Sequence, residues 1–101
     1  HVAHAHRFRG TRWTDDPHAL EAMTKKVPET MAAAVSLIEE HFFVGPWVTG
    51  DAYTICDPYL FTLCSWLEGD GVDTQAFPKL LAHREKMLSR PATQAALKRL
   101  G

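Results

Sequence analysis

Several features that mark particular protein classes are scarce in this sequence. Only two of its 101 residues are cysteines, Cys56 and Cys64. Eight residues along one helix would separate them by about 12 Å, which is too far for a disulfide. We therefore expect both to be small core residues in the reducing cytoplasm. No apolar run approaches the roughly 20 residues of a membrane span, and a net charge of −1 provides no basic field for phosphates. We accordingly expect neither a membrane nor a nucleic-acid partner.

Alternating apolar and polar residues, the pattern of a half-buried strand, are also missing. Every periodic segment instead shows the helical period. Thr14-Asp15-Asp16-Pro17 predicts the start of a long helix, because acids and proline suit a first turn. Pro28 lies in the middle of this helix and lacks a backbone N–H, so we expect a kink or a break there. One apolar face recurs at steps of three and four: Leu20, Met23, Val27, Met31, Ala34, Val35, Ile38 and Phe42.

The remaining helices differ in how apolar they are. Residues 1–9 resemble the tail of a helix, and residues 78–88 and 91–100 predict two short amphipathic helices that begin with proline. Residues 55–67 are apolar around nearly the whole circumference, which is typical of a helix at the centre of a domain. We therefore predict an all-α fold: one domain over residues 1–101, a bundle of about five helices around a buried central helix.

A capping box precedes the predicted central helix. In Thr54-Ile55-Cys56-Asp57, the Thr54 hydroxyl can accept from the Asp57 amide, while the Asp57 carboxylate reaches back to the amide of Thr54. Tyr53 can pack on the first turn as a hydrophobic staple. No second carboxylate is placed to form an acid–base pair with Asp57. We interpret Thr54 and Asp57 as structural residues.

This run and two others together resemble a known family. The segment from Gly50 to Phe61 resembles the C-terminal domain of glutathione transferases, whose buried helix carries a glycine, an aromatic or aliphatic staple, Ser or Thr, and Asp at this spacing. Trp66 completes a "YLFT…W" pattern like that of bacterial, beta-like members. Residues 77–80 and 90–97 look like the closing helices of the family. Pro58 departs from the pattern, because it replaces the usual staple partner and forfeits one helical hydrogen bond.

The histidines near the start of the chain suggest a metal site at first sight. On a helix, His1 and His4 share a face, but His6 points away from both. A zinc site needs three or four convergent ligands, so we expect no metal. The isolated His18, His41 and His83 are expected to face solvent or to cap helices.

The resemblance implies a different role for the first helix. In beta-like glutathione transferases, a His-Lys pair on this helix approaches the glutathione thiol, and the helix lines the pocket of the electrophile. His1 stands at the position of that histidine, and Val2 replaces the lysine. His4 and Phe8 follow along the implied pocket face. The resemblance thus implies that His1 lies near glutathione and that His4 and Phe8 contact the electrophile.

Two aromatic residues complete the implied pocket. Tyr59 and Trp66 are seven positions apart and lie on one stripe of the predicted central helix. Such a stripe is more often plain core, but the polar tips of Tyr and Trp need partners, and a cleft can provide them. Both readings stay open from the sequence alone, and we predict Tyr59 and Trp66 as electrophile-binding residues.

The resemblance also implies a function for a longer protein. The chain begins at His1 inside a helical stretch, and we expect a preceding thioredoxin-like domain that binds glutathione as co-substrate and activates its thiol. No catalytic residue and no cofactor are expected in residues 1–101. The family conjugates glutathione to hydrophobic electrophiles or reduces mixed disulfides, as a homodimer. Two alternatives are a non-catalytic protein-interaction module of the same fold and a helical domain without a ligand.

Overall fold

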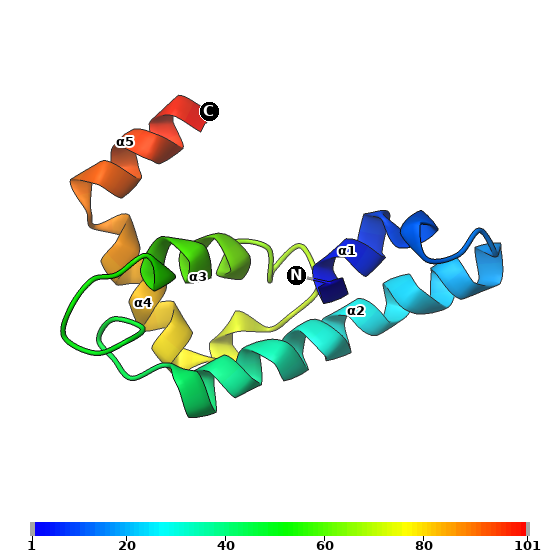
Figure 1. Cartoon of the computed structure of the whole chain (residues 1–101), viewed down its shortest axis with the longest axis horizontal. Coiled ribbons are helices and arrows are strands. Elements are labelled where there is room, and N and C mark those ends of the chain that lie inside the picture. Colours follow the sequence, from blue (N-terminus) through cyan, green and yellow to red (C-terminus); the bar gives the residue numbers. More distant parts are fainter. Residues whose placement is uncertain (1, 101) are drawn as a thin grey trace.

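Five α-helices make up most of the computed structural model, which describes residues 2–100. Within these residues there is no β-strand, and the predicted all-α fold is confirmed. The molecule is elongated, with extents of 46, 33 and 21 Å (Figure 1). The helices are α1 (Val2–Phe8), α2 (Pro17–Leu37), α3 (Cys56–Cys64), α4 (Pro78–Leu88) and α5 (Pro91–Leu100). Shorter helical turns cover Gly10–Arg12, Ile38–Phe42 and Thr74–Ala76.

The helix starts follow local signals in the sequence. The Asp16 side chain accepts a hydrogen bond from the His18 amide at 3.0 Å, and Pro17 occupies the first turn of α2. Pro78 and Pro91 begin α4 and α5. Proline suits a first turn because its missing N–H would have no partner there. The predicted boundaries of these helices are confirmed.

Pro28 does not interrupt α2. The helix runs without a break from Pro17 to Leu37, and Figure 1 shows it along the lower edge of the molecule, from the right end past the centre. Of the predicted kink or break, the break is wrong, because packing holds both sides of the proline: Val27 and Met31 are 1% and 3% exposed. The Pro28 ring also lies against Gly71, where an added Cβ would come within 3.0 Å of Pro28 Cγ.

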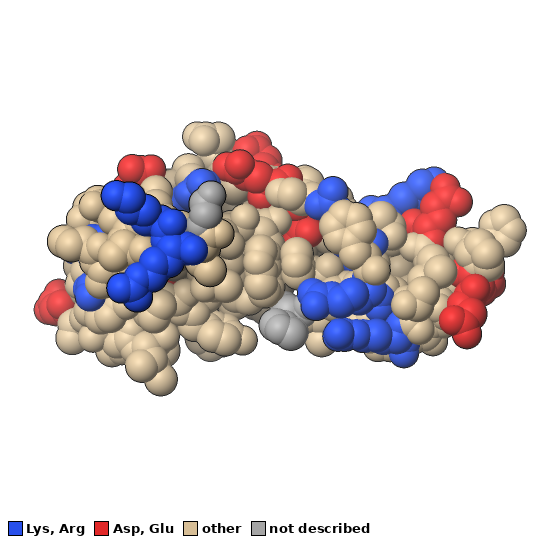
Figure 2. Space-filling model, turned by 90° about the horizontal axis from the view of Figure 1, so that it is seen from above, with Lys and Arg blue, Asp and Glu red and all other residues tan. Residues whose placement is uncertain are grey.

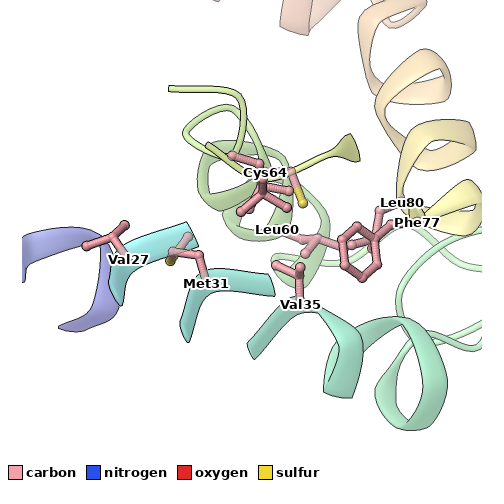
Figure 3. Close-up of a cluster of buried hydrophobic side chains, with 9 residues drawn as sticks. Val27, Met31, Val35, Leu60, Cys64, Phe77 and Leu80 are labelled. Carbon is pink, nitrogen blue, oxygen red and sulfur yellow. The ribbon is translucent and has the colours of Figure 1, made fainter. Parts of the chain in front are cut away.

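The core lies where α2, α3 and the start of α4 meet. Figure 3 shows Val35 of α2, Leu60 and Cys64 of α3, and Leu80 of α4 pointing toward one another. At about 25 cal/mol per Å² of buried apolar surface, this cluster is the main source of stability for the domain. α1 packs along α2, whereas α5 packs on α4 and has no buried residue.

Helix α3 is less enclosed than its composition predicts. Leu60 and Cys64 are buried, but Ile55, just before the helix, is 88% exposed and Tyr59 is 63% exposed. The helix is therefore buried on one face only in this chain. Its other apolar face, which carries Tyr59, is open to solvent.

Candidate functional site

His4 and Trp66, two of the predicted electrophile-binding residues, lie against each other. His4 projects from α1, and Trp66 lies in the turns that follow α3. Their rings stack with centroids 4.1 Å apart and planes 13° apart. Both side chains are half-buried. The pair lies at the junction of α1 and the turns that follow α3.

A buried carboxylate, that of Asp70, lies beside the pair of His4 and Trp66. Asp70 is 3% exposed, and its Oδ2 atom lies 2.6 Å from Nδ1 of His4. Nη1 of Arg7 lies 3.7 Å from the other carboxylate oxygen, Oδ1. Arg7 follows His4 by three positions, so both point from the same side of α1 toward Asp70. The sequence interpretation did not single out Asp70 or Arg7.

Phe8 and Tyr59 do not join this pair. Phe8 ends α1 with its ring 79% exposed, and the Arg7 guanidinium carbon lies 4.7 Å above the ring centroid. Tyr59 lines an apolar groove of about 320 Å³ together with Ile38, Phe42 and Ile55, among others. His1 lies outside the described residues. Of the predicted site residues that the structure describes, only His4 and Trp66 lie against each other, and Phe8 is exposed at the far end of α1.

The capping box forms with one change of partner. The Thr54 amide donates to Oδ2 of Asp57 at 2.8 Å, as predicted. The Thr54 hydroxyl accepts from the Cys56 amide at 3.3 Å, whereas the Asp57 amide donates to the Thr54 carbonyl oxygen. The helix start is tighter than an α-turn, which explains why the hydroxyl meets the nearer amide.

Asp57 has a further partner that the sequence interpretation misplaced. Its Oδ1 atom lies 2.9 Å from Nε2 of His83 and accepts from the Val48 amide at 2.9 Å. His83 is 2% exposed, so the expectation that it faces solvent or caps a helix is wrong. His18 and His41 are exposed. Asp57 and His83 form a buried pair that joins the start of α3 to α4.

These hydrogen bonds determine the acidity of Asp57. Burial by itself raises the pKa of a carboxyl group. Hydrogen bonds from the Thr54 and Val48 amides and from His83 outweigh burial and hold the pKa of Asp57 below its ordinary value. Asp57 is thus a carboxylate at neutral pH, and its partners identify it as a structural group.

A second groove lies between α3, α4 and α5. Its volume is about 520 Å³, and its lining is mostly apolar, including Phe61, Met87 and Leu97. Arg84 and Arg90 add positive charge. Neither this groove nor the one at Tyr59 is lined by His4 or Trp66.

Other features give little sign of a different kind of site. No helix among residues 2–100 is long and apolar enough to cross a membrane. Within the same residues, no three or more His, Cys, Asp or Glu side chains gather as metal ligands. On the described part of the face seen in Figure 2, basic and acidic side chains form small groups, and at the upper right blue and red side chains adjoin each other.

Comparison with protein families gives a match over most of the chain. The family model described as "Glutathione S-transferase, C-terminal domain" matches residues 4–91. Glutathione S-transferase GST-4.5 of Xanthomonas campestris pv. campestris is 26% identical over 94 residues, which are 93% of this chain and 46% of that protein. Glutathione S-transferase GstA of Escherichia coli O157:H7 is 32% identical over 62 residues, 61% of this chain and 28% of that protein.

A crystal structure gives a stronger match. It is that of a glutathione transferase homolog from Sulfitobacter with bound glutathione, which is 45% identical and superposes with a TM-score of 0.95. The match covers 98% of this chain and 53% of the Sulfitobacter chain. The chain therefore spans about half the length of the Xanthomonas and Sulfitobacter relatives.

Proposed function

We propose a function for the whole protein from one premise: the chain belongs to the glutathione S-transferase C-terminal domain family. In this proposal, the whole protein conjugates glutathione to a hydrophobic electrophile or reduces mixed disulfides with it. The observation that carries the proposal is the 45% identity, at a TM-score of 0.95, to a glutathione transferase homolog that holds glutathione.

The proposal divides the chemistry between two domains. A thioredoxin-like domain that precedes residues 1–101 binds glutathione and lowers the pKa of its thiol, because the thiolate is the nucleophile. The present domain supplies a wall of the electrophile site. The stacked rings of His4 and Trp66, 4.1 Å apart, suit a flat apolar substrate, since ligand sites combine aromatic walls with few polar groups.

Partner surfaces are a second part of the proposal. Ile55, Val44 and Phe42 are 88%, 70% and 64% exposed, and they lie around or near the groove that contains Tyr59. Large clustered apolar side chains of this kind mark surfaces that another surface covers. We propose that the preceding domain and a second copy of the protein, in a homodimer, cover the apolar surface of this domain. Sedimentation of the whole protein should give the dimer mass.

Turnover by the whole protein and by the domain alone tests the central proposal. The whole protein should conjugate glutathione to a chromogenic dinitrophenyl halide, and residues 1–101 alone should give no rate above buffer. Turnover by the domain alone would contradict the division of chemistry. If the folded whole protein neither bound glutathione nor acted on electrophiles and mixed disulfides, the non-catalytic module would replace the transferase.

Replacement of Trp66 tests the assignment of the wall. Trp66→Ala in the whole protein should raise the KM for the electrophile and leave the KM for glutathione nearly unchanged, because only the electrophile loses its contact surface. Trp47→Ala is a matched control, because Trp47 packs on Tyr53, away from His4. Thermal midpoints are measured beside the kinetics, since removal of a large side chain also leaves a cavity. Equal changes in both KM values would remove Trp66 from the site.

A further inference from the structure

The Asp70 carboxylate is a buried group to which the proposed function assigns no task. It is 3% exposed, and its Oδ1 atom is buried without a hydrogen-bond partner among the described residues. Native structures contain few such atoms, and each needs an explanation. Asp70 lies directly behind His4, with Oδ2 and Nδ1 at 2.6 Å. A role in orienting the imidazole explains why a carboxylate is buried at this point.

The short contact determines which nitrogen of His4 carries a proton. A carboxylate only accepts hydrogen bonds, so the nitrogen at 2.6 Å must be a donor, Nδ1–H. In neutral imidazole the other nitrogen, Nε2, then holds a lone pair and is an acceptor. The Arg7 guanidinium lies 3.7 Å from Oδ1, so a positive charge stands beside the carboxylate that this arrangement requires.

Stacking on Trp66 fixes the plane of the His4 ring. The Trp66 ring lies parallel to His4 within 13°, so the imidazole is fixed by one edge and by one face. The bonding directions of Nδ1 and Nε2 diverge across the ring, which turns Nε2 away from Asp70. The His4 side chain remains 19% exposed, and no residue between 2 and 100 hydrogen-bonds to Nε2.

We propose that Asp70 is a positioning residue that holds His4 as its Nδ1–H tautomer and presents Nε2 as a hydrogen-bond acceptor to the ligand of the electrophile site. The inference rests on the proposed function, because the ligand is the one that the transferase binds beside Trp66. An acceptor on an aromatic wall selects flat apolar molecules that carry a hydroxyl or amide N–H donor. Second-layer carboxylates fix histidine tautomers in the same way at other sites.

Imidazole nitrogen NMR of the 101-residue chain tests the tautomer without any assay. At about pH 8.5, two units above the ordinary histidine pKa of about 6.5, His4 should show protonated Nδ1 and unprotonated Nε2. His4→Gln assigns the signals, and the exposed His18 is the internal reference. Protonated Nε2 in wild-type His4 would overturn the proposal even if no variant could be folded.

Asp70→Asn supplies the second measurement. The asparagine amide oxygen should face the Arg7 guanidinium, which only donates. The amide NH2 then donates to Nδ1 and should reverse the tautomer, so that Nε2 becomes protonated. In the whole protein, the ratio of kcat/KM for an electrophile with a hydroxyl donor to that for its methyl ether should fall about three- to tenfold, the usual worth of one neutral hydrogen bond. A mere loss of stability would not change this ratio.

The outcomes separate the two proposals. An unchanged ratio in an active enzyme would overturn the contact between Nε2 and the ligand. A whole protein that lacks transferase activity but shows the expected tautomer in wild type and its reversal in Asp70→Asn would remove the proposed function and leave the positioning of His4 by Asp70 supported.

Discussion

At Asp57, a single carboxylate that is 0% exposed joins three parts of the chain. It accepts from Thr54 in the capping box, from Val48 in the preceding loop and from His83 in α4. A capping box by itself contributes about 1 to 2 kcal/mol. Removal of Asp57 takes the acceptor from all three partners at once. Asp57 should therefore contribute more to the free energy of unfolding than its capping box alone.

Asp57→Ala should lower the free energy of unfolding by about 3 kcal/mol or more, because the donors of Thr54, Val48 and His83 lose their acceptor at a cost of about 1 to 3 kcal/mol for each buried donor. Urea unfolding of the 101-residue chain measures it. The exposed Asp51 provides the control, since Asp51→Ala should change stability by less than about 0.5 kcal/mol. A loss of only 1 to 2 kcal/mol would mean that His83 and Val48 find other partners.

The two cysteines should differ sharply in reactivity, because Cys64 is buried whereas the expectation of a core position is wrong for Cys56, which is exposed. Burial raises the pKa of the Cys64 thiol to about 11, with the Arg84 charge opposing the shift and the Glu39 carboxylate adding to it. The thiolate is the reactive form, so native Cys64 should resist alkylation near pH 8, whereas exposed Cys56 should be modified. Mass spectrometry after iodoacetamide treatment counts the labels. The Cys56→Ser variant keeps Cys64 as its single cysteine. Rapid labelling of this variant in its folded state would contradict the burial of Cys64.

At the scale of secondary-structure elements, α4 takes its N-terminal cap from a distant residue. Glu39, in the turn after α2, accepts from the amides of Lys79 and Leu80 at 2.8 and 3.0 Å. The first amides of a helix have no partner within the helix, so both Glu39 oxygens satisfy groups that the local sequence leaves open. A carboxylate is also favoured at this end of the helix dipole.

Glu39→Ala should therefore destabilise the chain by about 1 to 3 kcal/mol, because the buried Leu80 amide and the partly buried Lys79 amide lose their acceptor. Glu40→Ala is the matched control, since Glu40 is exposed and close in sequence. Thermal denaturation followed by circular dichroism compares the two variants. Equal midpoints would show that water replaces the Glu39 carboxylate at the start of α4.

The elements that the sequence predicts correctly are those determined by neighbours in the chain. Asp16 and Pro17 start α2, and Pro78 and Pro91 start the last two helices, because caps and prolines act within one turn. Pro28 misleads for the same reason. Its local effect predicts a break, but packing of the residues beside it on the core keeps α2 continuous.

The candidate site is less predictable because its contacts join distant positions. The stripe on the predicted central helix indicated Trp66, and the family resemblance implied His4. The structure brings these two residues together. Asp70 contacts His4 across 66 positions, and His83 contacts Asp57 across 26. Periodicity gives the face of a helix but not which carboxylate meets it, so neither pair could be read from spacing.

On the scale of the whole molecule, the free energy of unfolding should decrease at acidic pH because Asp57 becomes protonated. Its pKa is lowered in the folded chain, so its contribution is complete above the ordinary pKa of about 3.9 and is lost as the pH falls through the lowered value. The difference in unfolding free energy between wild type and Asp57→Asn should thus narrow below about pH 4. Urea unfolding at several pH values measures it, and a constant difference would contradict the ionic role.

The loop between Phe43 and Ile55 lies outside the helices, yet its Val48 and Thr54 amides are bonded to the fully buried carboxylate of Asp57. An amide proton exchanges with solvent deuterium only when its bond opens, and we expect these two bonds to open together with the core that holds Asp57. Deuterium uptake at Val48 and Thr54 should consequently match the slow uptake of α3 rather than that of the neighbouring loop amides. The loop and the core then open as one cooperative unit, and a protease can cut this loop only as fast as the core itself opens.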